Sequence, residues 1–413
     1  MRSSWNTGSI HLQEQTDEDI LSALLSVAFD YQLPVAAWRL PNQEEHHFII
    51  DFSSGVKQLD KLNLEELGKG FVFSPYSKNF SVEACQPAMK SLFIKADVHF
   101  KTGKRLTHPL PSAPSWFYDI ILQAVREPGS QNNPYHVTHN PPDEYEDDYQ
   151  NLVANAISAI RRGEMLKVVP SRTKKVQLPA NFNLVRTFLR LSNQYPGAFV
   201  SLVSIPETGT WLGASPETLI ETYPGPGHQQ HFRTMALAGT QQYNPEIPLS
   251  DVAWRQKEIE EQALVSRYII NCFKRIRLRE FEENGPKTVS AGKLIHLRTD
   301  FTVNMDAVNF PELGSVMLEL LHPTSAVCGM PKESALAFLE AHENYDRSFY
   351  SGFLGPVNIE NRNQLFVNLR CVQLLQHEAL LYAGAGVTAH SNPQKEYEET
   401  EMKMQTIAEV LNA

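Results

Sequence analysis

Six polar residues in the carboxy-terminal two thirds of the chain could together perform acid–base chemistry on an anion. They are Lys167, Glu217, Glu261, Arg370, Glu399 and Lys403. Burial disfavours the charged form of a lysine and of a glutamate, which would prepare one as a base and the other as an acid. Two more carboxylates suit a hard cation such as Mg²⁺, and an arginine and a second lysine suit the carboxylates of a substrate. We therefore expect one active site assembled from distant segments.

Taken singly, the candidate base and acid have ordinary explanations as well. Lys167 lies in the apolar run 166–170, where it is either a buried base or an edge-strand lysine that faces solvent. Glu217 follows the sequence Gly-Ala-Ser-Pro at 213–216, which predicts a turn between two strands. Such a turn either points the carboxylate at a defined place or leaves it in solvent.

Two pairs of glutamates recur at helical spacing in distant segments. Glu258 and Glu261 are three residues apart, as are Glu396 and Glu399, and Lys403 lies one turn further on. An acidic face of this kind is usually solvated. Two helices that each present a carboxylate inward would instead form an oxygen-rich site for Mg²⁺. The spacing alone leaves both explanations open.

Two glycine-bearing turns could bring backbone N–H groups close to a ligand carboxylate. One is 238–240 (Ala-Gly-Thr) and the other is 383–386 (Ala-Gly-Ala-Gly). Neither has the GxxxxGK[ST] or GxGxxG pattern of a nucleotide site. His296 and His322 could belong to the core or to the site, and neither has the HExxH spacing of a zinc enzyme.

The pattern of apolar residues predicts an α+β fold in which antiparallel strands and helices are segregated. Helices are expected at 17–31, 146–162, 182–194, 251–282, 312–321, 332–343 and 395–411. Strands are expected at 35–40, 46–52, 70–75, 92–100, 166–178, 199–205, 210–214, 218–223, 231–239, 293–305, 348–359, 364–375 and 379–387. Residues 127–147 are rich in Pro, Asn and Asp, and they mark the expected boundary between a variable N-terminal α+β portion, 1–145, and a catalytic region, 146–413.

Composition and charge limit the classes of function. The 413 residues are 42% hydrophobic and 20% charged, which is ample for a large core. The net charge of -10, without a basic stripe, argues against a nucleic-acid partner. No run approaches the roughly 18 apolar residues that span a membrane, and the polar N-terminus lacks the core of a signal peptide. We expect a cytoplasmic protein with no membrane partner, and a monomer.

Several segments together resemble the chorismate-utilising enzymes. They are KVVPSR, GASPE, ALAGT, LLHPTSAVCG, FYSGFLG, LRC, AGAGV and EYEET, which cover about residues 146–413. The resemblance implies the fold of anthranilate synthase component I, with large antiparallel sheets and helices around a central site. It also implies chorismate as substrate, Mg²⁺ as cofactor, Lys167 and Glu217 as catalytic residues, and Glu261 and Glu399 as metal ligands. The substrate-binding residues that it implies are Ala238, Gly239, Thr240, His322, Ala326, Val327, Arg370, Gly384, Gly386 and Lys403.

Within this resemblance, two positions indicate water as the nucleophile. Lys167 stands where anthranilate and aminodeoxychorismate synthases carry glutamine, and water, unlike ammonia, needs a base. Ala238 stands where aminodeoxychorismate synthases commonly carry a nucleophilic lysine. The N-terminal portion also lacks the Leu-Leu-Glu-Ser-type element tied to tryptophan feedback, and no glutaminase domain or subunit is expected. We therefore expect an isochorismate synthase, with salicylate synthase as the alternative and anthranilate synthase component I as a more distant one.

Three residues depart from the common pattern of these enzymes. Glu258 replaces aspartate and Gln262 replaces histidine on the metal-binding helix, and Ser325 replaces proline in the HPTSA segment. Their effect on the surroundings of the metal and the substrate stays open, as does the pathway, which could lead to menaquinone, a catechol siderophore or salicylate.

Overall fold

The helices and strands form two large antiparallel sheets with helices on the outside. The computed structural model describes residues 16–53, 55–76, 89–102, 117, 120, 121, 123, 124, 134–138 and 148–411. Its α-helices are α1 (Asp17–Asp30), α3 (Tyr149–Arg161), α4 (Leu184–Gln194), α5 (Gln256–Arg275), α6 (Leu313–Leu321), α7 (Lys332–His342) and α8 (Pro393–Leu411). Its strands are β1 (Val35–Arg39), β2 (His46–Ile50), β3 (Lys57–Leu59), β4 (Gly70–Ser74), β5 (Ser91–Lys95), β6 (Val98–Lys101), β7 (Lys167–Val168), β8 (Ser171–Gln177), β9 (Phe199–Ile205), β10 (Gly209–Ser215), β11 (Thr218–Pro224), β12 (Gln230–Gln242), β13 (Glu282–Ala291), β14 (Leu294–Asn304), β15 (Gly329–Met330), β16 (Phe353–Val357), β17 (Asn363–Val367), β18 (Cys371–Leu374) and β19 (Glu378–Gly384).

The two sheets pack face to face around an aromatic core. The first sheet has the order β6-β2-β1-β9-β10-β18-β19-β8, and the second has the order β13-β14-β12-β11-β17-β16-β4-β5-β3. Trp38, Phe199 and Trp211 from the first sheet pack against Phe71 and Phe366 from the second. All five side chains are at most 2% exposed, so this layer joins the sheets into one body.

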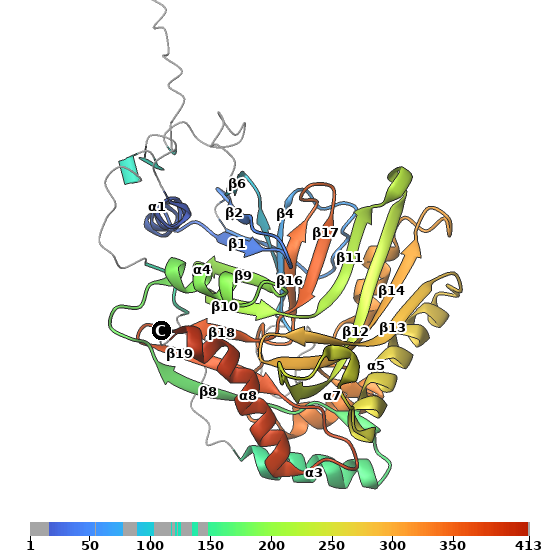
Figure 1. Ribbon diagram of the computed structural model, residues 1–413. Helices are drawn as coiled ribbons and strands as arrows, with labels where there is room; N and C mark the ends of the chain where they lie inside the picture. Colours follow the sequence, from blue (N-terminus) through green and yellow to red (C-terminus); the bar gives the residue numbers. More distant parts are fainter. Residues whose placement is uncertain are drawn as a thin grey trace, which may run out of the picture.

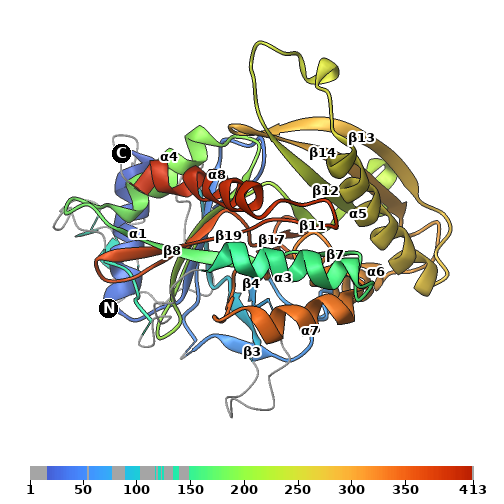
Figure 2. The same ribbon diagram turned by 90° about the horizontal axis from the view of Figure 1, so that it is seen from below.

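Helices cover the outer face of each sheet. Apolar residues of α1, α4 and α8 pack on the first sheet, and those of α5 and α6 pack on the second. Figure 1 shows α5 beside β12 and β14, and Figure 2 shows α8 next to α4 on the other side of the molecule. This arrangement confirms the expected α+β fold with antiparallel sheets.

Three predicted strands are each divided between separate sheets. The run 92–100 becomes β5 in the second sheet and β6 in the first. The run 364–375 becomes β17 in the second sheet and β18 in the first, and Arg370 lies in the crossing with a φ of 49°. The run 166–178 becomes β7 and β8, which separate at Pro170 because proline has no N–H to donate to a ladder. Strand β7 pairs with β15 in a small sheet of two strands, and Val168 also forms a single bridge with Val387.

One predicted helix is too long at its C-terminal end. The expected helix 251–282 is α5, which ends at Arg275, and residues 282–291 form strand β13. This strand is an exposed edge whose sequence, EENGPKTVSA, lacks alternation of apolar and polar residues, so its pairing with β14 determines its structure.

Most of the expected boundary, 127–147, lies outside the described residues. The first part of the chain nevertheless contributes strands to both sheets, because β1 pairs with β9 and β4 pairs with β16.

Candidate active site

A cavity lies where strands pass from one sheet to the other. Glu217 lies in the crossing from β10 to β11, and Arg370 lies in the crossing from β17 to β18. The cavity brings together most of the residues that the sequence predicts at the site. Those that line it are Glu217, Ala238, Gly239, Thr240, Glu261, Ala326, Val327, Arg370, Gly384, Gly386 and Lys403.

Lys167 is fully buried beside this lining, which excludes an edge-strand lysine in solvent. Its side chain is 0% exposed, and its Nζ lies 2.9 Å from Oε1 of Glu261 on α5. Gly386 packs directly against the pair. A Cβ at this position would collide with the Glu261 carboxylate and lie 3.1 Å from Cε of Lys167, so a larger residue would displace this pair.

Glu217 is held in a buried bend and carries a proton at neutral pH. Its N–H donates to Ser215 Oγ at 3.3 Å, and its carbonyl accepts from Val367 N at 3.0 Å. The residue is 3% exposed. Burial raises the pKa of Glu217 from its ordinary 4.5 to about 8, although Lys167 and Lys403 act in the opposite direction. The carboxyl group can therefore donate a proton.

Two cations face the cavity from different elements. Burial lowers the pKa of Arg370 to about 10, so the guanidinium stays charged at neutral pH. Among the described residues, no carboxylate lies within ion-pair distance of it, which leaves its donors available to an anionic ligand. Lys403 on α8 donates to the carbonyl of Gly384 at 2.9 Å and pairs with Glu399 at 2.7 Å. Both cations are suited to substrate carboxylates.

Gly239 interrupts the ladder between β12 and β14. Its φ is 69°, and the register between these strands shifts between Ala238 and Gln241. The carbonyl of Gly239 accepts a hydrogen bond from Nδ1 of His296 at 2.9 Å. A positive φ is a conformation that glycine adopts readily, so the bulge turns the backbone of this segment into the cavity.

Carboxylates from α5 and α8 approach one another, each neutralised by a lysine. Besides the pairs of Glu261 with Lys167 and Glu399 with Lys403, Nζ of Lys257 lies 2.6 Å from Oε1 of Glu396. Burial alone would raise the pKa of Glu261, but Lys167, Lys257 and Lys403 hold it below its ordinary value.

The same carboxylates could accept a hard cation. Oε2 of Glu396 is buried without a hydrogen-bond partner in the described structure. Mg²⁺ usually binds one or two protein carboxylates and keeps several water molecules, so oxygen donors on two helices fit it. Within the described ranges, no three acidic, histidine or cysteine side chains form a ready-made metal cluster. The lysine Nζ atoms lie next to the carboxylate oxygens that a cation would bind.

His296, which the sequence leaves open between core and site, lines the cavity, whereas His322, predicted to bind substrate, is not part of the lining. Burial and the nearby Arg370 lower the pKa of His296 to about 3, so its ring is neutral. His322 contributes nothing to the lining. Its Nε2 lies 3.0 Å from the carbonyl of Tyr76, and its ring packs edge-on against Phe353. These contacts are those of a residue that joins α6 to the second sheet.

Gln262, one of the three departures from the common pattern of the chorismate-utilising enzymes, faces the sheet. Its Nε2 donates to Thr299 Oγ1 at 3.0 Å and approaches the carbonyl of Ala236 at 3.3 Å. The side chain is 2% exposed. It therefore ties α5 to β12 and β14, and Glu261, one residue earlier, is left to point into the cavity.

Comparison with known proteins places the chain in a family. A family model described as chorismate binding enzyme matches residues 106–412. The chain belongs to the chorismate binding enzyme family. This match confirms the resemblance drawn from the sequence motifs and extends it upstream of residue 146.

Several named relatives of this chorismate binding enzyme are isochorismate synthases. Isochorismate synthase EntC of Escherichia coli K12 is 27% identical over 267 residues, which span 63% of this chain and 66% of that protein. Isochorismate synthase DhbC of Bacillus subtilis is 28% identical over 336 residues, which span 79% and 82% of the two chains. These relatives share the family and differ from this chain at most positions.

Solved structures show the same fold. The menaquinone-specific isochorismate synthase MenF of Escherichia coli matches with a TM-score of 0.69 and 20% identity, over 97% of this chain and 92% of that one. Anthranilate synthase component I from Streptococcus pneumoniae matches with a TM-score of 0.64 and 18% identity, over 91% and 90%. At this identity, the structural likeness establishes the fold alone.

Proposed function

We propose that this chorismate binding enzyme is an isochorismate synthase, an isomerase that moves the ring hydroxyl of chorismate from C4 to C2. The observation that carries the proposal is a buried lysine and a protonated glutamate at the same cavity. Lys167 is fully buried, and Glu217 has a pKa of about 8. Water needs a base before it can attack, and a departing hydroxyl needs an acid. The names of the relatives agree with this activity.

In the proposed reaction, Lys167 in its neutral form takes a proton from water, which attacks C2. Glu217 donates its proton to the hydroxyl that leaves C4 as water, and the ring double bonds shift. One water is consumed and one is released, so the overall change is an isomerisation. General acid–base catalysis of this kind contributes about 10²–10⁴-fold for each group.

Arg370, Lys403 and the glycine-bearing turns would bind the two carboxylates of chorismate. The planar guanidinium of Arg370 matches a carboxylate with two parallel hydrogen bonds. Gly239, Gly384 and Gly386 let the backbone approach the substrate closely. Ala238 carries no nucleophile, which supports direct attack by water.

The residues that would hold Mg²⁺ are Glu261 and Glu399. When bound, the ion would neutralise and orient a substrate carboxylate. The protein contributes two carboxylates on separate helices, with Lys257 and Glu396 next to them. Where the metal binds, Lys167 and Lys403 would be released from their present partners.

The direct test incubates the purified chain with chorismate and Mg²⁺ and identifies the product by chromatography. We expect isochorismate, without salicylate, pyruvate or, when ammonium is added, anthranilate. Lys167→Ala should abolish the conversion while the protein stays folded. Lys174→Ala, which removes an exposed lysine from neighbouring strand β8, is the matched control and should retain it. Isochorismate formation by Lys167→Ala would refute the assignment of the base, and salicylate from the unaltered chain would assign the alternative activity.

A further inference from the structure

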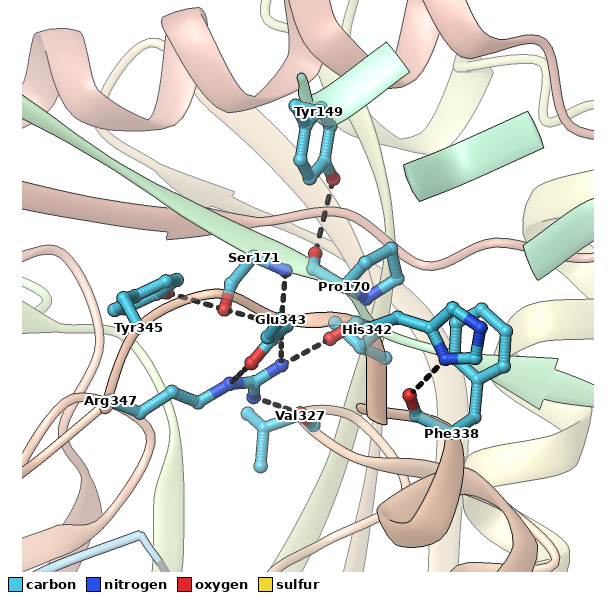
Figure 3. A network of polar contacts seen from close by, with 10 residues as sticks. Tyr149, Pro170, Ser171, Val327, Phe338, His342, Glu343, Tyr345 and Arg347 are labelled. Atoms are coloured by element: carbon cyan, nitrogen blue, oxygen red, sulfur yellow. Dashed lines mark hydrogen bonds and ion pairs between the residues drawn. The ribbon is translucent and has the colours of Figure 1, made fainter. Parts of the chain in front are cut away.

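A buried ion pair lies just beyond α7, outside the set of residues that the reaction uses. The side chains of Glu343 and Arg347 are 6% and 3% exposed. Nε and Nη2 of Arg347 donate to the two carboxylate oxygens of Glu343 at 2.7 and 2.6 Å, as Figure 3 shows. Apolar residues can often replace a buried ion pair without loss of stability, so its presence calls for another explanation.

The remaining donors and acceptors of this pair hold backbone atoms next to the cavity. Arg347 donates through Nη1 to the carbonyl of Val327 at 2.8 Å and through Nη2 to the carbonyl of Val169 at 2.7 Å. Both of these residues line the cavity. Oε1 of Glu343 accepts from the backbone N–H of Ser171 at 2.7 Å and from its hydroxyl at 2.9 Å. The pair therefore connects three separate segments of the chain.

The strand that carries Lys167 is held by short pairings. Besides β15, Val168 bridges to Val387, and the two residues exchange backbone hydrogen bonds at 3.1 and 2.8 Å. Strand β7 is two residues long and pairs with β15, Lys167 opposite Met330 and Val168 opposite Gly329. Arg347 binds one carbonyl at each side of this ladder, because Val169 directly follows β7 and Val327 lies two residues before β15. It thus closes the end of the ladder where Pro170 prevents further strand pairing.

The bend that follows β7 is held at each of its three residues. Arg347 binds the carbonyl of Val169, and Glu343 binds the N–H of Ser171. The carbonyl of Pro170 between them accepts from the hydroxyl of Tyr149 at 3.1 Å (Figure 3). Displacement of this bend would move the backbone of Lys167, three residues before Pro170.

We propose that Glu343 and Arg347 are positioning residues that fix Lys167 for attack by water. This inference rests on the proposed function and adds a role for residues that do not touch the substrate. A reacting group displaced by about 1 Å loses about 10²-fold in rate, whereas the cations that bind the substrate lie on other elements. Loss of the pair should therefore lower kcat and leave KM for chorismate unchanged.

The test compares three variants with the unaltered chain. Glu343→Leu combined with Arg347→Met removes both charges together and leaves no unpaired buried charge, so it should fold. Glu343→Gln keeps the size of the side chain and weakens the hydrogen bonds that this residue accepts from Arg347 and Ser171. Arg39→Lys is the matched control, because Arg39 is another buried arginine whose guanidinium binds backbone carbonyls, those of Leu40, Tyr195, Pro196 and Ala198 among them, away from Lys167.

We expect kcat of the double variant to fall about 10- to 100-fold with KM unchanged within about twofold, and kcat of Glu343→Gln to fall less. Arg39→Lys should lower the melting temperature and keep kcat. An undiminished kcat in the double variant, or a raised KM at constant kcat, would overturn the positioning role. Absence of isochorismate with the unaltered chain would instead refute the proposed function, so the two failures are distinguishable.

Discussion

Glu217 illustrates how burial gives a common residue an uncommon property. Its carboxyl group lies in a bend between two strands, where its own backbone makes hydrogen bonds and its side chain is removed from water. The same burial that makes it an acid also costs stability when it ionises. Activity and stability therefore depend on this residue in opposite directions.

Glu217→Gln should abolish isochorismate formation and stabilise the fold at neutral pH. The folded-state pKa of about 8 exceeds the ordinary 4.5, so the folded chain retains a proton that the unfolded chain releases. Stability of the unaltered chain therefore falls as the pH rises through this window. Glutamine cannot ionise, and it should raise the free energy of unfolding on the order of 3 kcal/mol at pH 7.

Denaturant unfolding from pH 5 to 8 measures this effect. The difference between variant and unaltered chain should be small near pH 5 and grow towards pH 8. Glu207→Gln, in an exposed turn, should show no such growth. A difference that is constant across the range would contradict the raised pKa of Glu217.

At the scale of elements, the site depends on segments that change from one sheet to the other. Glu217 and Arg370 each lie between a strand of one sheet and a strand of the other, and Lys167 lies on β7, which belongs to neither of the two large sheets. The backbone leaves the extended conformation at such crossings, as the positive φ of Arg370 shows. This turns side chains out of the sheets and into the space between them. The cavity follows from this topology.

The sequence predicts the types of these elements better than their partners. The motifs predict that Lys167, Glu217 and Arg370 lie close together, and in the structure Glu217 and Arg370 line one cavity with Lys167 buried beside it. The transfer of residues 364–375 between sheets was missed, since a continuous apolar run does not specify which sheet its halves join. Strand β13 is not predicted because it is polar and exposed. The sequence leaves His296 open between core and site because a single histidine in a strand carries no signal of the face it occupies.

We expect Mg²⁺ to bind carboxylates of both α5 and α8. Three lysines pair with carboxylates of these two helices. We expect Mg²⁺ to raise the melting temperature by a few degrees at concentrations well above its dissociation constant, because it binds only the folded arrangement. Calorimetry without substrate measures this rise independently of catalysis.

Two variants and one control localise the ion. Glu261→Gln and Glu399→Gln should lose the rise in melting temperature, since each removes a carboxylate from one helix. Glu260→Gln, an exposed neighbour on α5, should keep it. An equal rise in all three proteins would show that the ion binds elsewhere.

At the scale of the whole molecule, the N-terminal part is a structural component of both sheets. Strand β1 pairs with β9 over five residues, and β4 pairs with β16 over five residues. Trp38 and Phe71 from this part pack on Phe199 in the aromatic core between the sheets. Across the described residues, every helix is too short or too polar to span a bilayer. The expected division at residue 145 therefore separates parts of one folding unit.

A fragment of residues 146–413 should not fold by itself, although it contains all the residues proposed to bind or convert chorismate. Without the first part, β9 and β16 each lose a neighbouring strand, and one side of the aromatic core is exposed to water. We expect no cooperative thermal transition from this fragment. Co-expression with residues 1–145 should restore both the transition and isochorismate formation, because the two parts meet through ten paired residues along two strands. A sharp transition from 146–413 alone would show instead that the catalytic region is independent and that the N-terminal strands only extend its sheets.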